Sequence, residues 1–459
     1  RMTIILILLA GVQQLTKYEF FNHENKAYGL NYKVQKATYN SEVLDIQSYP
    51  KYTTPDKKNT HSILKNWKEK QTERKPKMIL LCVSGGGMKA ATWTTQVMQQ
   101  VDKATNGELM QHTSLISGAS GGMLGAAYMR EVYLQKALGR ELDVYDNQYI
   151  DNISTDLLNS IMFTIVANDL FLPWATFKYG GQKYYKDRGY IFEKQFNENT
   201  HGFLDKTLGA YKIPEQRAVI PMMFITPAIV NDGRRMVISP QGVSYMTKTP
   251  ITNSKRETVK ADAVDFGKIF AEQDAMNLKF STALRMNATY PYVLPNVHLP
   301  SKPEIEVLDA GFRDNHGISS ATRFIHVFKD WILKNTSGVV LVQIDTKDQI
   351  NQIDASDQDG LIGSIFNPLG IAAKLLKLQE FEHDTNLGFI FDILGEQNFD
   401  VIRFSYQPTK KNVKASMTYH LTEREKQDIL RAFYLEENQE NLKELKHILN
   451  IEHTPISKK

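Results

Sequence analysis

Apolar and polar positions along the chain fall into blocks that predict strands and helices in turn. Residues 78–83 read MILLCV, a short apolar run that ends at three glycines. A run of this length without polar positions is typical of a strand buried on both faces of a parallel sheet. Residues 88–104 follow with helical spacing, and their apolar side chains gather near one face: Ala90, Val97, Met98 and Val101.

The same order of elements returns over residues 112–138, where a short strand, a glycine turn and a long helix follow one another. Strand, glycine turn and helix, twice in succession, predict βαβ units. We therefore expect an α/β fold, with a central and mostly parallel sheet covered by helices on both faces. Further strands are predicted at 218–229, 235–239, 304–311 and 337–345.

These patterns divide the chain into unequal parts. The α/β domain is predicted over residues 77–430, with residues 133–215 as an insertion or lid. Residues 15–76 are expected to form an extension or linker, and residues 431–459 a helical tail. A capping box at Thr422 and Glu425 predicts where a late helix begins.

Two apolar stretches inside the domain, residues 157–174 and 361–378, are open to two interpretations. Each either covers the core or contacts lipid. Residues 51–77 carry nine Lys and Arg against three Asp and Glu. A run of this kind is more often a solvated connector than a membrane contact, and we expect a connector here.

The first residues, 1–14, include the almost entirely apolar ten-residue stretch TIILILLAGV, from residue 3 to residue 12. Three interpretations remain: the end of a membrane span, a signal segment, or a buried strand. A span would make the protein membrane-associated, with its catalytic domain in the cytoplasm. Without a span, we expect a cytoplasmic protein.

Composition narrows the function classes. The chain has 459 residues, 42% of them apolar, and its 55 basic and 51 acidic residues leave a net charge of only +4. That balance gives no argument for nucleic-acid binding. Cys82 is the single cysteine, so a disulfide framework is excluded, and we expect it to be a buried apolar residue. Zinc-type spacings and EF-hand loops are absent from the sequence, and we expect no metal and no cofactor.

The second glycine turn matches the pattern G-x-S-x-G. Residues 118–122 read GASGG between a predicted strand and a predicted helix. This is the context of a nucleophile elbow, a sharp turn that exposes one serine. Ser120 would lie at a helix N-terminus, where the helix dipole and free N–H groups favour negative charge.

The first glycine turn, Gly85, Gly86 and Gly87, has two interpretations. In a serine esterase, its N–H groups would form the oxyanion hole, which side chains would obstruct. Alternatively, Gly85, Gly87 and Ala90 fit a dinucleotide-binding loop, with Glu108 as the acidic partner further along. The first interpretation requires the two glycine turns to be neighbours.

The general base is less evident from pattern. Asp309 ends a predicted strand, where carboxylates of α/β sheets commonly face the ligand crevice. His316 follows seven residues later, so a Ser–His–Asp esterase remains an alternative, with His316 or His326 as the base. A nucleotide-dependent oxidoreductase and a non-catalytic lipid-binding protein also remain open.

Taken together, the stretches SGGGMKA, GASGG and DAGFRDNHG resemble the patatin-like phospholipases, an α/β family related to the cytosolic phospholipases. The stretch NDGRRMVIS also resembles a strand pair of that family, and ALRMNATYPYVLP resembles its segment before the catalytic aspartate. The resemblance covers about residues 77–430, and its specificity comes from three motifs in the same order.

The resemblance implies a Ser–Asp dyad without histidine. Ser120 matches the nucleophile and Asp309 the base, while Gly85, Gly86 and Gly87 match the oxyanion loop. Lys89 matches a basic, substrate-binding position at which Arg is common. The aspartate motif reads D-A-G where D-G-G or D-G-A is usual, and Ala310 lacks the freedom of glycine at positive φ.

The implied activity is metal-independent hydrolysis of an acyl lipid, of the phospholipase A or lysophospholipase type. The implied partners are the lipid substrate and a membrane surface.

Overall fold

The structure is a computed structural model of the chain. It describes residues 25–164, 175–249, 259–290, 293–346, 368–409, 415 and 418–451. The predicted span or signal at residues 1–14 lies outside the described residues, as do residues 165–174 and 361–367 of the two apolar stretches. Among the helices described, none has both the length and the apolar character that crossing a membrane requires.

The central sheet has five parallel strands, in the order β14-β13-β2-β3-β6. Their bounds are β14 (Phe399–Ser405), β13 (Val339–Asp345), β2 (Met78–Val83), β3 (Thr113–Gly118) and β6 (Met222–Ile225). Val83 pairs with Gly118 on one side and with Ile344 on the other. Because the strands are parallel, the loops that follow β2, β3 and β13 meet at one edge.

Strand β2 is apolar on both faces, so helices cover both faces of the sheet. Its side chains alternate between two cores, which is why the run has no polar position. Three of them pack with helices α4 (Gly87–Ala104) and α6 (Ser120–Ala137), and the other three with α14 (Ile318–Asn335) and α16 (Pro368–Leu394). The first set is Ile79, Leu81 and Val83, and the second is Met78, Leu80 and Cys82.

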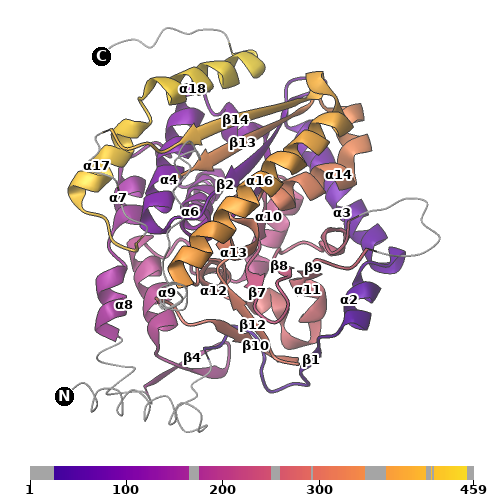
Figure 1. Ribbon diagram of the computed structural model, residues 1–459, viewed down its shortest axis with the longest axis vertical. Helices are drawn as coiled ribbons and strands as arrows, with labels where there is room; N and C mark the ends of the chain where they lie inside the picture. Colours follow the sequence, from indigo (N-terminus) through magenta and orange to yellow (C-terminus); the bar gives the residue numbers. More distant parts are fainter. Residues whose placement is uncertain are drawn as a thin grey trace, which may run out of the picture.

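Figure 1 shows the resulting three layers, with α4 and α6 on one side of the sheet and α14 and α16 on the other. Helices α17 (Glu423–Ala432) and α18 (Glu436–Ile448) join the layer of α4. Helix α17 begins with the predicted capping box of Thr422 and Glu425. The predicted α/β class with a parallel central sheet is therefore confirmed.

A second sheet of five short strands lies beside the first, in the order β10-β12-β7-β8-β9. Its pairs are antiparallel except β8 with β9. The bounds are β10 (Val297–Leu299), β12 (Ile305–Leu308), β7 (Ala228–Ile229), β8 (Arg235–Val237) and β9 (Ala263–Asp265). The run 218–229, predicted as one strand, divides into β6 and β7, since Pro227 between them has no N–H to donate.

The stretch expected to be a connector contains a long helix, α3 (Pro50–Glu69). Pro50 is its first residue, a position that needs no N–H donor. Ile63, Leu64 and Trp67 are buried in the same core as α14, so only the basic face of this helix remains in solvent.

Several elements cover the end of the molecule that bears the site. Helix α12 (Phe280–Asn287) precedes β10, and the short helix α13 (Gly311–Asp314) follows β12. The predicted insertion, residues 133–215, contains α7 (Gln148–Ser154), α8 (Leu158–Thr164), the hairpin β4–β5 (Thr176–Tyr179, Gln182–Tyr185) and α9 (Arg188–Asn199), and it ends within α10 (Lys212–Gln216). The remaining elements include β1 (Ala37–Thr38), β11 (Ser301–Lys302), α2 (Ser41–Gln47), α5 (Glu108–His112) and α11 (Phe266–Ile269).

Candidate active site

Ser120 lies in the sharp turn between β3 and α6. Its φ of 47° is in the left-handed region, which costs a residue other than glycine about 1–3 kcal/mol. The turn is pressed against the end of β2: a Cβ on Gly118 would lie 2.1 Å from the Val83 carbonyl oxygen, and one on Gly122 would lie 2.3 Å from that of Ser84. The glycines on both sides of Ser120 are therefore required by close backbone approach.

The two glycine turns are neighbours, as the esterase interpretation requires. A Cβ on Gly121 would lie only 1.8 Å from the carbonyl oxygen of Gly87. Gly87 is the first residue of α4, and Gly121 lies in the first turn of α6, so neither N–H has an acceptor within its own helix. Two free donors at adjacent helix N-termini can hold a developing oxyanion.

Gly85 differs from the two glycines that follow it. Its N–H donates to the carbonyl of Asn315, 3.1 Å away, and is therefore occupied. A Cβ here would lie 2.8 Å from Asn315 Oδ1 and 3.2 Å from the Cβ of Ser120. The structure thus places Gly85 against the nucleophile and gives a packing reason for its missing side chain.

Lys89 lies behind the glycine loop. The side chain is buried, Nζ donates to the Thr346 carbonyl at 3.1 Å, and the ammonium lies 5.7 Å from the centre of the Tyr406 ring. Thr346 in turn donates its hydroxyl to the carbonyl of Gly85, at 3.0 Å. Lys89 therefore supports the loop from the end of β13, and its predicted contact with substrate stays a prediction.

Asp309 follows β12 of the second sheet, not a strand of the parallel sheet. Its side chain is buried, Oδ1 accepts from Gly311 N at 2.7 Å, and Oδ2 has no hydrogen-bond partner among the described residues. Burial raises the pKa of Asp309 to about 6, although Gly311 and the nearby Ser120 hydroxyl lower it in part. A carboxylate with this pKa is a far better base at neutral pH than a solvated one.

The loop around Asp309 is held by backbone bonds to the end of α12. Asp309 N donates to Thr289 O at 3.0 Å, and Ala310 N donates to Asn287 O at 3.2 Å. Ala310 has φ −59° and ψ −26°, an ordinary right-handed conformation. The D-A-G sequence therefore fits this turn without the positive φ that would require glycine.

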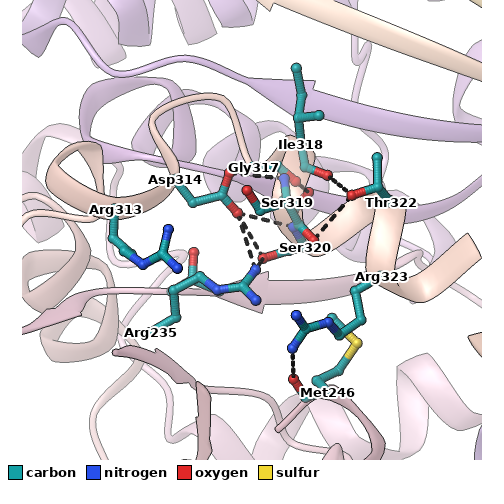
Figure 2. A network of polar contacts seen from close by, with 12 residues as sticks. Arg235, Met246, Arg313, Asp314, Gly317, Ile318, Ser319, Ser320, Thr322 and Arg323 are labelled. Atoms are coloured by element: carbon teal, nitrogen blue, oxygen red, sulfur yellow. Dashed lines mark hydrogen bonds and ion pairs between the residues drawn. The ribbon is translucent and has the colours of Figure 1, made fainter. Parts of the chain in front are cut away.

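Beyond Asp309, the chain is anchored by Asp314, as Figure 2 shows. Its carboxylate accepts from Ser320 N at 3.0 Å and Ser320 Oγ at 2.9 Å, at the first turn of α14, and lies 3.6 Å from Arg235 Nη1. Burial alone would raise the pKa of Asp314, but His383 and Arg235 hold it well below its usual range. Asp314 is thus an anion at neutral pH, and it fixes α13 and α14 to the second sheet.

The histidines considered as bases have other neighbours. His316 is buried, its Nε2 lies 3.4 Å from Asp345 Oδ1, and its ring packs edge-on against His383. His326 lies on α14. Glu108, the acidic residue of the dinucleotide interpretation, pairs with His112 at 2.8 Å. In the described part of the chain, no group of three His, Cys, Asp or Glu side chains is arranged to hold a metal ion.

Tyr419 is a site residue that sequence reasoning missed, because it lies in no recognisable motif. Its hydroxyl donates to the Ala288 carbonyl, between the two residues that hold the Asp309 loop. Burial and then the Asp309 carboxylate raise the pKa of Tyr419 well above its usual value, and the nearby Ser120 hydroxyl lowers it. The phenol therefore has Asp309 and Ser120 among its electrostatic neighbours.

Comparison with known proteins gives one family match. The family model described as Patatin-like phospholipase matches residues 81–322, just over half of the chain. No curated protein sequence matches.

Similar solved structures include human GIVD cytosolic phospholipase A2 in complex with methyl gamma-linolenyl fluorophosphonate, with a TM-score of 0.41, 12% identity, and 88% of this chain and 64% of that chain covered. A second structure of human GIVD cytosolic phospholipase A2 has a TM-score of 0.35 and 11% identity over 64% of this chain, which spans only 50% of that chain. VipD from Legionella pneumophila has a TM-score of 0.31 and 9% identity, with 81% of this chain and 67% of that chain covered.

Proposed function

The chain belongs to the patatin-like phospholipase family, and from that membership we propose that it hydrolyses acyl lipids, in the manner of a phospholipase A or lysophospholipase. The observation that carries the proposal is the convergence of Ser120, Asp309 and the glycine loop at one edge of the central sheet. Ser120 is strained and only 6% exposed, and its hydroxyl lies close enough to Asp309 to lower the pKa of that carboxyl. A nucleophile and a base next to free N–H donors form the minimum set for acyl transfer.

In the first step, Ser120 Oγ attacks the carbonyl carbon of the lipid ester. Asp309 takes the hydroxyl proton, and its Oδ2, which has no other partner among the described residues, is the atom we assign to this task. Catalytic hydrogen bonds are often long without substrate, so the pair is expected to close when an ester binds.

The negative charge that forms on the carbonyl oxygen needs donors already in place. We assign the N–H groups of Gly86, Gly87 and Gly121 to this oxyanion hole, since the N–H of Gly85 is held by Asn315. The tetrahedral intermediate collapses, the C–O bond of the ester breaks, and the proton on Asp309 passes to the leaving alcohol or lysolipid.

In the second step, Asp309 removes a proton from water, and the resulting hydroxide attacks the acyl-serine. The fatty acid leaves, and Ser120 regains its proton. Every proton transfer in this scheme uses Asp309, and no histidine is required.

We further propose that the enzyme acts at a membrane surface, because long-chain acyl lipids reside there. Exposed apolar side chains on α16 support this part of the proposal. Leu378, Phe381 and Phe389 are each about three-fifths exposed, and several large apolar side chains exposed on one helix suit an interface with lipid.

The test is covalent labelling with a fluorophosphonate probe, which reacts with activated serines. Wild type should label, Ser120→Ala should not, and Asp309→Asn should label at least 100-fold more slowly, in the range that general-base removal costs. Ser114→Ala, at the opposite end of β3, is the matched control and should label like wild type. A folded wild-type protein that does not label, or one that labels at a residue other than Ser120, would overturn the proposal.

His316→Gln separates the dyad from a Ser–His–Asp triad. A dyad predicts labelling within a few-fold of wild type, because His316 lies against Asp345 and His383. A triad predicts a loss of several orders of magnitude.

A further inference from the structure

Residues 418–420, which precede α17, lie across the active-site edge of the sheet. The carbonyl of Thr418 accepts from Met88 N at 2.8 Å, directly behind Gly87. The carbonyl of Tyr419 accepts from Leu157 N and Leu158 N, at 3.0 and 3.1 Å. These three residues, here named the strap, thus join the glycine loop to α8.

Side chains of the strap also hold it in place. His420 Nδ1 lies 3.0 Å from Asp156 Oδ1, and the Tyr419 ring packs edge-on against Phe192 at 5.6 Å. The strap lies far beyond residue 322, where the match to the family model ends. Its contacts with the site therefore come from a part of the chain outside the three sequence motifs.

The side chain of Tyr419 reaches the segment that positions the base. Its hydroxyl donates to the Ala288 carbonyl, and the next residue, Thr289, accepts the N–H of Asp309 at 3.0 Å. The Tyr419 side chain is buried, so its one proton is committed to Ala288 and water does not compete for it. The oxygen of the phenol still has a lone pair, which can accept a hydrogen bond.

The donor that we assign to that lone pair is Ser120. The Ser120 hydroxyl lowers the pKa of both the Tyr419 phenol and the Asp309 carboxyl, which puts it near both groups. A serine hydroxyl rotates freely about its Cα–Cβ bond unless its oxygen and proton have fixed partners. Hydrogen bonds to a buried phenol on one side and to a carboxylate on the other would give Ser120 Oγ a defined orientation.

We propose that Tyr419 is a positioning residue of this active site: its hydroxyl braces Ala288 and orients Ser120 toward Asp309. This inference rests on the proposed function and adds a third polar group to the dyad. It assigns the strap a role in turnover, because without it the Asp309 segment and the glycine loop each lose a partner.

The experiment compares Tyr419→Phe with two controls in the full chain. Tyr419→Phe removes the hydroxyl and keeps the ring. Tyr245→Phe removes another buried hydroxyl, which forms a 3.0 Å hydrogen bond with the Thr60 hydroxyl. This pair does not belong to the site. Phe192→Leu weakens the ring packing of Tyr419 but keeps its hydroxyl. We measure kcat and KM on a micellar lysophospholipid, the rate of fluorophosphonate labelling, and the melting temperature.

The expected result is a fall in kcat and labelling rate of about 10- to 100-fold for Tyr419→Phe, the range for a misoriented reacting group, with KM within about 2-fold. Tyr245→Phe should lower the melting temperature as Tyr419→Phe does, but it should not lower kcat. Phe192→Leu should lower kcat less than Tyr419→Phe does. A Tyr419→Phe enzyme with wild-type kcat and labelling rate would overturn the inference, as would equal losses of kcat in all three variants.

If Tyr419→Phe does not fold, a ring-fluorinated tyrosine at position 419 keeps the shape and weakens the oxygen as an acceptor. A slower labelling rate supports the inference, and an unchanged rate overturns it. The two proposals fail in different ways: an unlabelled wild type removes the proposed function, whereas a labelled wild type with an equally reactive Tyr419→Phe removes only the role of Tyr419.

Discussion

The side-chain amide of Asn287 donates to the carbonyl of Gly118, 3.2 Å away and two residues before Ser120. Its oxygen accepts from Thr226 N at 2.9 Å, and its backbone carbonyl accepts from Ala310 N, next to Asp309. One fully buried residue therefore joins the nucleophile turn, the end of β6 and the loop of the base. Ser120 and Asp309 follow strands of different sheets, and the hydrogen bonds of Asn287 link the two segments at the site.

Asn287→Ala should therefore affect both stability and catalysis. It leaves the Thr226 N–H and the Gly118 carbonyl unpaired, and each buried unpaired group costs about 1–3 kcal/mol. We expect a lower free energy of unfolding in urea and a labelling rate reduced at least 10-fold, since small misplacements at a reacting centre are expensive.

Asn231→Ala is the matched control for that variant. Asn231 also bridges two backbone groups, accepting from Glu306 N at 3.1 Å and donating to Glu304 O at 2.9 Å, but in solvent. Its removal should change neither measurement much. Equal losses in the two variants would contradict the positioning role of Asn287.

Turnover should depend on pH through Asp309. Burial raises the pKa of Asp309 to about 6, and only its ionised form can take the Ser120 proton. We expect kcat/KM to rise about tenfold per pH unit below about pH 6 and to level off above it. The pH dependence of kcat/KM should be the same in wild type and in His316→Gln. An acid limb that shifts in His316→Gln would argue for a histidine base.

Asp309 also lowers stability at neutral pH, and Asp309→Asn should reveal this. The raised pKa means that the folded state binds more protons than the unfolded state between about pH 4 and pH 6, so the free energy of unfolding falls as pH rises through that window. An amide is free of this penalty. Asp309→Asn should be more stable than wild type by about 2–3 kcal/mol at pH 8 and by nothing at pH 3.

Urea unfolding of both proteins at the two pH values checks the sign. A constant difference between Asp309→Asn and wild type across pH would mean that the carboxylate is not the cause.

The contact between the two glycine turns should not tolerate a methyl group. In Gly121→Ala the new Cβ would lie 1.8 Å from Gly87 O, so the two turns must separate and the oxyanion donors with them. We expect labelling to be lost and the melting temperature to fall. Gly388→Ala is the control: position 388 lies within α16, and a Cβ there meets nothing within 4 Å. This variant should be stabilised slightly, because alanine favours helix by about 1 kcal/mol over glycine.

Restoring the family glycine at position 310 should bring no gain. Ala310 already has right-handed backbone angles, so Ala310→Gly relieves no strain and adds freedom to the unfolded chain. We expect a loss of stability of about 0.5–1 kcal/mol and unchanged kcat. A several-fold increase in kcat would show that the D-A-G turn restrains the base.

Local sequence was sufficient for the elements and motifs that depend on neighbours in the chain. The apolar run of β2 predicted a strand buried on both faces, and its residues indeed alternate between two cores. Thr422 and Glu425 predicted the start of α17, because a capping box is completed within four residues. The three ordered motifs indicated the family, since each needs only a few residues in fixed spacing.

Where those elements lie relative to one another depended on contacts that no local pattern carries. Asp309 was expected at the end of a strand, but the pattern did not show that the strand belongs to a second sheet. The basic stretch after residue 50 was expected to be a connector, because its buried Ile63, Leu64 and Trp67 are few among many charges. Pro227 divides one apolar run between two sheets, which only the pairing of β6 and β7 reveals.

The sequence by itself therefore determined the fold class and the residues that match the family motifs. Tertiary structure decided the surroundings of those residues: a buried Asp309, a Gly85 N–H held by Asn315, and a Tyr419 from far along the chain. The physical reason is that burial and long-range hydrogen bonds depend on the whole packed chain, whereas strand, helix and turn preferences are set by adjacent residues.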